Sequence, residues 1–164
     1  MTRARSISRR RVLATLGAAG VAAAGGGLGA PRRAEAQAQL GLQESVQEAL
    51  RRVLGGRPVK DGAGVVRLDA PLIAENGAVV PVTVEVSSPM TPASHVKHVY
   101  IVADKNRIPI IARATLFPES GQALVGANVR LGETGDVRAI VEQSDGTLLQ
   151  VRREVKVTVG GCGG

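Results

Sequence analysis

Aromatic residues are almost absent from this 164-residue chain, which has one tyrosine, one phenylalanine and no tryptophan. Tyr100 and Phe117 alone give no platform on which nucleic-acid bases could stack. The formal net charge of +7, from 21 Lys and Arg against 14 Asp and Glu, is also uneven along the chain. Seven arginines precede residue 37, opposed by Glu35 alone, which leaves 14 positive and 13 negative charges from Gln37 onward. A nucleic-acid partner is therefore not expected.

Residues that carry out catalysis or bind metals are equally scarce. His95 and His98 are the two histidines, and in a strand their spacing would put them on opposite faces, which is unsuited to holding one metal ion. We expect them to be surface or edge residues. The carboxylates are scattered, and no glycine-rich phosphate-binding motif occurs. The sequence therefore predicts no self-contained active site, with no catalytic residue, no metal and no cofactor of its own.

The first 36 residues are predicted to be an export signal. Arg9 and Arg10 form a twin-arginine pair, residues 12–30 carry no charge, and residues 34–36 read Ala-Glu-Ala, the pattern of a signal peptidase site. A membrane anchor is the alternative, but residues 12–30 include seven Ala and six Gly and are weakly apolar. We therefore expect a periplasmic protein without an anchor, exported by the twin-arginine route and cleaved after Ala36 or, alternatively, Ala38.

The remaining chain predicts one helix followed by short strands. Residues 43–54 place apolar side chains at helical spacing, with acidic residues early, arginines late and Gly55-Gly56 as the stop. Beyond Pro58, β-branched runs alternate with turn residues such as Glu75-Asn76-Gly77. The last run and the segment around Glu85 alternate valine with polar residues, as expected when one face of a strand is buried. Seven strands are predicted, over residues 65–68, 78–86, 96–103, 108–116, 122–131, 137–143 and 147–159.

These patterns predict a mainly β fold. Seven short strands separated by turns indicate an immunoglobulin-like antiparallel β-sandwich, and the lack of βαβ alternation argues against a parallel doubly wound sheet. We expect four segments. These are a twin-arginine signal peptide (1–36), an N-terminal helix and linker (37–60), the β-sandwich domain (61–159) and a flexible C-terminal Gly-Gly-Cys-Gly-Gly arm (160–164).

The single cysteine, Cys162, lies in that arm. An odd cysteine in an exported protein indicates an intermolecular bond or a thiol kept for chemistry. Gly160, Gly161, Gly163 and Gly164 surround it, so the arm should be thin and the thiol exposed. Fully extended, the three residues after the last strand would carry the thiol about 10 Å outward, at ~3.3–3.6 Å per residue. Such an arm could enter a cleft too narrow for a folded domain.

The C-terminal pentapeptide, after Glu-Val-Lys-Val-Thr-Val at 154–159, resembles the end of the SoxY family, the sulfur-carrier subunit of the periplasmic thiosulfate-oxidising (Sox) system. Residues 70–82, 88–90 and 144–146 also resemble that family. The resemblance implies a carrier protein that is not an enzyme. It also implies that Cys162 is the covalent attachment point for thiosulfate-derived sulfur and that the four glycines form the arm.

The same resemblance implies partners. A haem-containing enzyme would join thiosulfate to the cysteine, a metal-dependent hydrolase would release sulfate, and a sulfane dehydrogenase would oxidise the remaining sulfur. A SoxZ-like β-sandwich subunit would form a heterodimer with this chain and share its export.

Two other readings of the C-terminus remain open. Gly163-Gly164 would allow a ubiquitin-like carrier that bears a terminal thiocarboxylate, but the export leader and the strand count argue against it. The chain could also be a periplasmic β-sandwich interaction module whose cysteine forms a disulfide with a partner. The position of added sulfur would separate these readings, because it would lie on Cys162, on the Gly164 carboxylate or nowhere.

Overall fold

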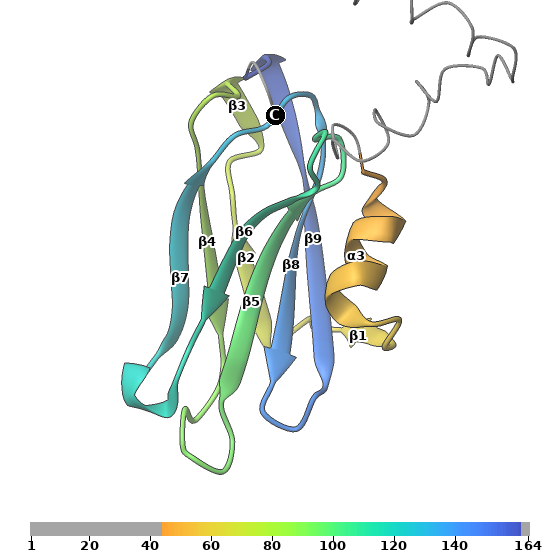
Figure 1. Cartoon of the computed structure of the whole chain (residues 1–164). Coiled ribbons are helices and arrows are strands. Elements are labelled where there is room, and N and C mark those ends of the chain that lie inside the picture. Colours follow the sequence, from red (N-terminus) through yellow and green to blue (C-terminus); the bar gives the residue numbers. More distant parts are fainter. Residues whose placement is uncertain (1–43, 162–164) are drawn as a thin grey trace, which may run out of the picture. The chain divides into compact units, whose positions relative to one another are not determined.

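The structure, a computed structural model, describes residues 44–161. The chain divides into two units, Met1–Ala36 and Gln37–Gly164, and all described residues belong to the second. They form one α-helix, one short 3-10 helix (Pro118–Ser120) and nine strands in two sheets (Figure 1). The prediction of a mainly β sandwich is confirmed. Within the described part, no helix combines the length and apolar character needed to cross a membrane.

The two sheets differ in size. The larger has the strand order β1-β9-β8-β5-β6, with β3 also paired to β9, and the smaller has the order β2-β4-β7. Neighbouring strands are antiparallel except that β1 and β3 both run parallel to β9. The strands are β1 (Val59–Asp61), β2 (Val66–Asp69), β3 (Ile73–Asn76), β4 (Val80–Val86), β5 (Val96–Ala103), β6 (Ile110–Thr115), β7 (Ala123–Val129), β8 (Gly135–Gln143) and β9 (Leu148–Val159).

The main hydrophobic core lies between the sheets. In β4, Val80, Val82, Val84 and Val86 are buried while Glu85 between the last two is exposed, so the predicted alternation is confirmed. These valines meet apolar residues on the inner face of the larger sheet. Burial of this many branched aliphatic side chains is the main source of stability in a domain with so few aromatics.

A second, smaller core lies on the outer face of the larger sheet, under α3 (Val46–Leu54) (Figure 1). Ser45 and Glu48 form a capping box: the Glu48 N–H donates to Ser45 Oγ at 3.2 Å and the Ser45 N–H to Glu48 Oε2 at 3.1 Å. Gly55, at φ 65°, ends the helix in the left-handed conformation. The helix is therefore shorter at its start than the predicted 43–54. Its partners in the sheet are Tyr100, Val102, Ile140 and Leu148.

All seven predicted strands are present, but β1 and β3 were not predicted. β3 includes Glu75 and Asn76, whose residue types predict a turn, and β1 crosses the expected boundary between linker and sandwich at residue 60. Both strands are short and mostly exposed, so they lack an alternating pattern. They form because each adds to β9, a pairing distant in sequence.

Candidate functional site

The last strand, β9, carries the chain to the candidate site. Up to Val155 it pairs with β8, and from Lys156 to Val159 it pairs with β3. Its second half is also held from the β8 side, where the Val157 N–H donates to Thr134 Oγ1 at 2.9 Å. The end of β9, β3 and the loop between β7 and β8 thus meet at one end of the sandwich, the upper end in Figure 1.

Gly77 and Leu131 connect these segments through their backbones. The Gly77 N–H donates to the Val159 carbonyl at 2.7 Å, and the Gly77 carbonyl accepts from the Leu131 N–H at 2.7 Å. The Leu131 carbonyl in turn accepts from the Gly161 N–H at 3.0 Å. Gly161 is buried, whereas Gly160 is exposed. We call Gly160, Gly161, Gly77 and residues 130–132 the arm mount.

Side chains would not fit at three glycines of the arm mount. A Cβ at Gly77 would overlap the Leu131 carbonyl, and one at Gly160 would overlap the Gly132 carbonyl. A Cβ at Gly161 would lie 2.7 Å from the Gly77 oxygen and 2.9 Å from the Ala78 Cα. The nearest contact at each position is with a backbone oxygen, which cannot rotate away as a side chain can. Close approach of backbones is therefore the reason for glycine here.

Asn106 supports the arm mount from the loop between β5 and β6. Its side chain is buried, donates from Nδ2 to the Arg130 carbonyl at 2.7 Å and accepts at Oδ1 from the Gly132 N–H at 3.0 Å. The carbonyl and N–H on either side of Leu131 are thereby fixed. Nothing in the sequence pattern pointed to this residue, because Asp104-Lys105-Asn106 has the composition of an ordinary turn.

The structure thus places part of the predicted site. Cys162, Gly163 and Gly164 lie outside the described residues, so the attachment point and the arm beyond it stay predictions. Gly160 and Gly161 do lie at the C-terminal end of β9, as expected. In the structure the Gly161 N–H donates to the Leu131 carbonyl, and Gly160 lies against the Gly132 carbonyl. The flexibility expected of the arm stays a prediction.

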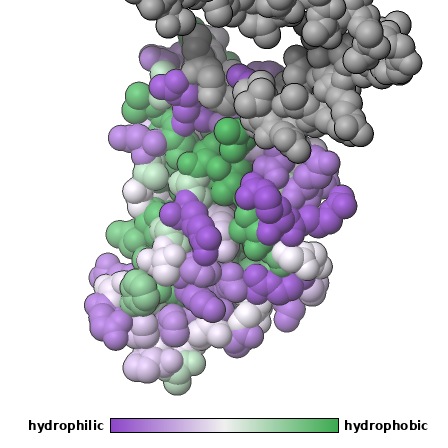
Figure 2. All heavy atoms as spheres, in the orientation of Figure 1, coloured by the Kyte–Doolittle hydropathy of each residue, from purple (hydrophilic) through white to green (hydrophobic). Residues whose placement is uncertain are grey.

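Apolar surface adjoins the arm mount. Val79, next to Ala78, is 61% exposed, and Val159, next to Gly160, is 62% exposed. On the face seen in Figure 2, apolar surface is concentrated in the upper half and the lower half is mostly polar. Exposed apolar residues that gather at one place are typical of a protein contact.

The histidines do not form a joint site. His95 Nδ1 lies 3.2 Å from the Thr91 carbonyl, and His98 Nδ1 lies 3.0 Å from Thr115 Oγ1. Burial and the neighbouring Arg113 lower the pKa of His98, which favours its neutral form. Both are half-buried rather than fully exposed. Among residues 44–161, no three His, Cys, Asp or Glu side chains are grouped so that they could hold a metal ion.

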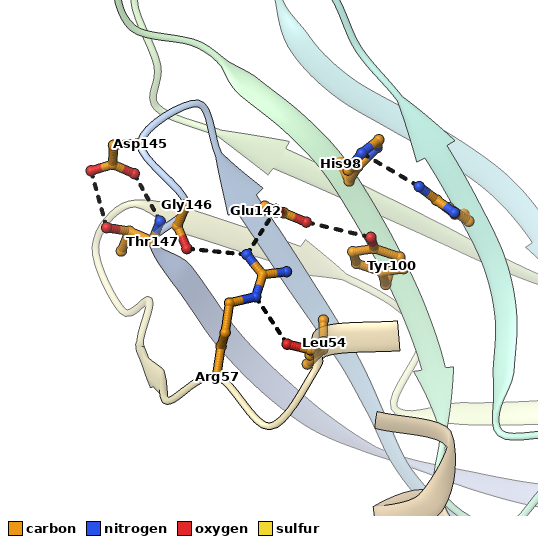
Figure 3. A network of polar contacts seen from close by, with 9 residues as sticks. Leu54, Arg57, His98, Tyr100, Glu142, Asp145, Gly146 and Thr147 are labelled. Atoms are coloured by element: carbon orange, nitrogen blue, oxygen red, sulfur yellow. Dashed lines mark hydrogen bonds and ion pairs between the residues drawn. The ribbon is translucent and has the colours of Figure 1, made fainter. Parts of the chain in front are cut away.

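A polar network between helix and sheet is the second feature that the sequence did not reveal (Figure 3). Arg57 donates from Nη1 to Glu142 Oε1 at 2.8 Å and from Nε to the Leu54 carbonyl at 2.9 Å, while Tyr100 Oη donates to Glu142 Oε2 at 3.5 Å. The hydrogen bond from Arg57 lowers the pKa of Glu142, and burial raises the pKa of Tyr100. The network joins the end of α3 to β8 and β5, far from the arm mount in the fold, so its role is structural.

Comparisons with known proteins agree with the resemblance found in the sequence. A family model described as "Sulfur oxidation protein SoxY" matches residues 50–162. The chain is similar to the solved structure of the sulfur carrier protein SoxY from Chlorobium limicola f thiosulfatophilum. The identity is 30%, the TM-score is 0.58, and the match covers 70% of this chain and 97% of that one. No curated protein sequence matches.

Other similar structures are more distant. A superoxide reductase (neelaredoxin) from Ignicoccus hospitalis is 18% identical, with a TM-score of 0.52 over 71% of this chain and 94% of that one. A putative superoxide reductase from Thermotoga maritima is 17% identical, with a TM-score of 0.51 over 61% and 92%. At these identities the likeness shows a shared fold and nothing of the chemistry. The family model, by contrast, covers most of the chain and extends through Cys162, and the chain therefore belongs to the SoxY family of sulfur oxidation proteins.

Proposed function

We propose that this protein is a periplasmic sulfur carrier that holds thiosulfate-derived sulfur covalently on Cys162. Membership of the SoxY family supports a carrier role rather than a catalytic one. The single observation that carries the proposal is the family match through Cys162, the one thiol in the sequence. Cys162 follows directly on the glycines of the arm mount.

The proposed loading step is an oxidation. The Cys162 thiol loses its proton, its sulfur bonds to the sulfane sulfur of thiosulfate, and two electrons pass to the haem-containing partner. Hydrolysis then consumes water, releases sulfate and leaves a persulfide on the cysteine for the sulfane dehydrogenase. The thiolate is the reacting form, and sulfur–sulfur bonds form and break by exchange without change to the protein core.

The partners and the export route belong to the same proposal. A SoxZ-like subunit would pair with the β-sandwich, and the three enzymes would visit the end that carries the arm. The exposed Val79 and Val159 support a protein contact at that end. Residues 1–36 would direct the folded protein through the twin-arginine pathway and be removed.

Mass spectrometry tests the attachment. Purified protein is incubated with thiosulfate and the haem-containing partner, and the added mass is located by peptide mapping. We expect it on Cys162 and absent from Cys162→Ser, which should fold and pair normally. Added sulfur on the Gly164 carboxylate would favour the thiocarboxylate carrier, and a disulfide to a partner without added sulfur would favour the interaction module. Either result would overturn the proposal.

A further inference from the structure

We infer that His98 and Arg113 form an acid-sensitive contact, which holds the edge strand β6 to β5 and loosens when His98 takes up a proton. The inference goes beyond the proposed function, because it concerns the outer face of the larger sheet rather than the sulfur-bearing cysteine. It rests on the hydrogen bonds, the cation–π contact and the charges around His98 among the described residues.

Two neighbours on β6 fix the protonation state of His98. The Arg113 guanidinium can only donate, and its Nη2 lies 3.4 Å from His98 Nε2, so this ring nitrogen must accept and carries no hydrogen. The ring hydrogen is then on Nδ1, which donates to Thr115 Oγ1 at 3.0 Å. The ring is therefore satisfied on both sides, but only in its neutral form.

Protonation would turn the contact between His98 and Arg113 from attraction into repulsion. A charged ring has a hydrogen on both nitrogens, so two donors and two positive charges would face each other. Arg113 cannot move aside without loss, because its Cζ lies 5.5 Å from the Tyr100 ring centroid in a cation–π contact. Tyr100 lies beside His98 on β5 (Figure 3), and burial raises its pKa, so it stays neutral when His98 titrates.

The other charged groups near His98 do not remove this conflict. Glu142 on β8 is in register with His98, but its carboxylate already accepts from Arg57 at 2.8 Å. Lys97, the sequence neighbour, and Arg57 itself add positive charge. Burial and then Arg113 outweigh the attraction of Glu142, so the pKa of His98 lies below its ordinary value.

The strand β6 is sensitive to this contact because it lies at an edge. It ends the strand order of the larger sheet, and among the described strands its ladder partner is β5. Its inner residues Ala112 and Ala114 are partly buried, and their small side chains contribute little apolar burial. We therefore expect acid to loosen β6 before the rest of the sandwich.

The proposed sulfur chemistry would supply the acid. When the Cys162 thiol joins thiosulfate, two electrons pass to the haem-containing partner and the thiol proton is released. Hydrolysis of the adduct then splits a water molecule, whose oxygen leaves in sulfate. One of its protons stays on the persulfide and the other is released. The carrier would thus respond to acid that its own cycle produces, and the switch rests on the proposed function only for this source of protons.

Amide hydrogen exchange of the purified protein at about pH 8 and about pH 5, on either side of the histidine range, tests the contact. Protection factors remove the intrinsic effect of pH on exchange. The reporter is the Leu116 amide, just after β6, which donates to the Lys97 carbonyl at 3.0 Å, and β8 amides are the reference. We expect the Leu116 protection factor to fall about tenfold at the lower pH relative to β8, as for one hydrogen bond involving a charged group. The fall should be absent in His98→Gln, whose side chain stays neutral.

His95→Gln is the matched control. His95 Nδ1 lies 3.2 Å from the Thr91 carbonyl, an acceptor that a charged ring can still serve, so this variant should keep the wild-type fall. Arg113→Gln removes the repulsion, and it serves if His98→Gln does not fold. Proton NMR titration should then give His98 a higher pKa than in the wild type.

Three results would overturn the switch. They are a wild-type protein without the fall, the same fall in His98→Gln, and a His98 pKa that Arg113→Gln leaves unchanged. None of these measurements involves sulfur. A protein that does not load thiosulfate would therefore refute the proposed function while the exchange data still decide the switch.

Discussion

Glycines in this protein serve two different physical needs. Gly55 and Gly146 have positive φ angles, of 65° and 84°, and open space where a Cβ would be, so they provide turns. Gly77 has no such angle, and backbone atoms occupy the place of its missing side chain. The same residue type therefore marks a turn in one place and a contact between backbones in the other.

This distinction gives a prediction at the residue scale. Gly77→Ala should lower the free energy of unfolding by about 1–3 kcal/mol, because the new methyl group would overlap the Leu131 carbonyl. Gly126→Ala, in β7, is the control, since its nearest neighbour would be Thr83 Oγ1 at 3.9 Å. Filling that space should be neutral or stabilise by about 0.5–1 kcal/mol. Urea unfolding of both variants measures the difference, and equal stabilities would contradict the tight contact at Gly77.

At the scale of elements, predictability followed the strength of the local pattern. β4 could be predicted because buried valines alternate with outward residues. β3 could not, because four mostly exposed residues ending in Asn76 look like a turn until β9 is placed beside them. The arm mount was hidden for the same reason. The Gly-Gly-Cys-Gly-Gly motif can be recognised because its residues are consecutive in the sequence. Gly77, Asn106 and Leu131, by contrast, come together only in the folded protein.

The contact between α3 and the sheet gives a prediction about pH. The hydrogen bond from Arg57 depresses the pKa of Glu142 in the folded state. A carboxyl with a depressed pKa contributes stability above its unfolded pKa, about 4.3, and loses it as the pH falls through the folded value. Because Arg57 is partly exposed, we expect Glu142→Gln to cost about 1 kcal/mol at pH 7.

The cost of Glu142→Gln should shrink toward zero below about pH 4, where the wild-type carboxyl becomes neutral as well. The Glu142 charge also raises the pKa of His98, so part of the cost of Glu142→Gln between pH 7 and about pH 4 comes from His98, and this part disappears as well once the carboxyl is neutral. Urea unfolding across this range provides the measurement, with the exposed Glu154→Gln on β9 as control. A cost independent of pH would show that shape rather than charge explains the effect.

At the scale of the whole molecule, the described residues of the second unit form two hydrophobic clusters. Among these residues the clusters extend from Val46 to Val157, whereas the proposed export signal covers residues 1–36. That agrees with the proposed use of a pathway for folded cargo. On that proposal, the route of export and the stability of the described domain are two properties that can be changed independently.

Replacing Arg9 and Arg10 together with lysine should therefore leave the protein folded but in the cytoplasm. The charge of the leader is unchanged, so only recognition of the arginine pair is altered. The free energy of unfolding should stay within about 0.5 kcal/mol of the unaltered precursor, as for surface substitutions in general. Arg32→Lys with Arg33→Lys is the matched control, an arginine pair in the same leader, and should be exported normally. Cell fractionation with intact mass measures both proteins, and the exported form should begin at Gln37 or Gln39. A periplasmic form that still begins at Met1 or Thr2 would refute cleavage, and export of the Arg9 and Arg10 variant would refute the twin-arginine route.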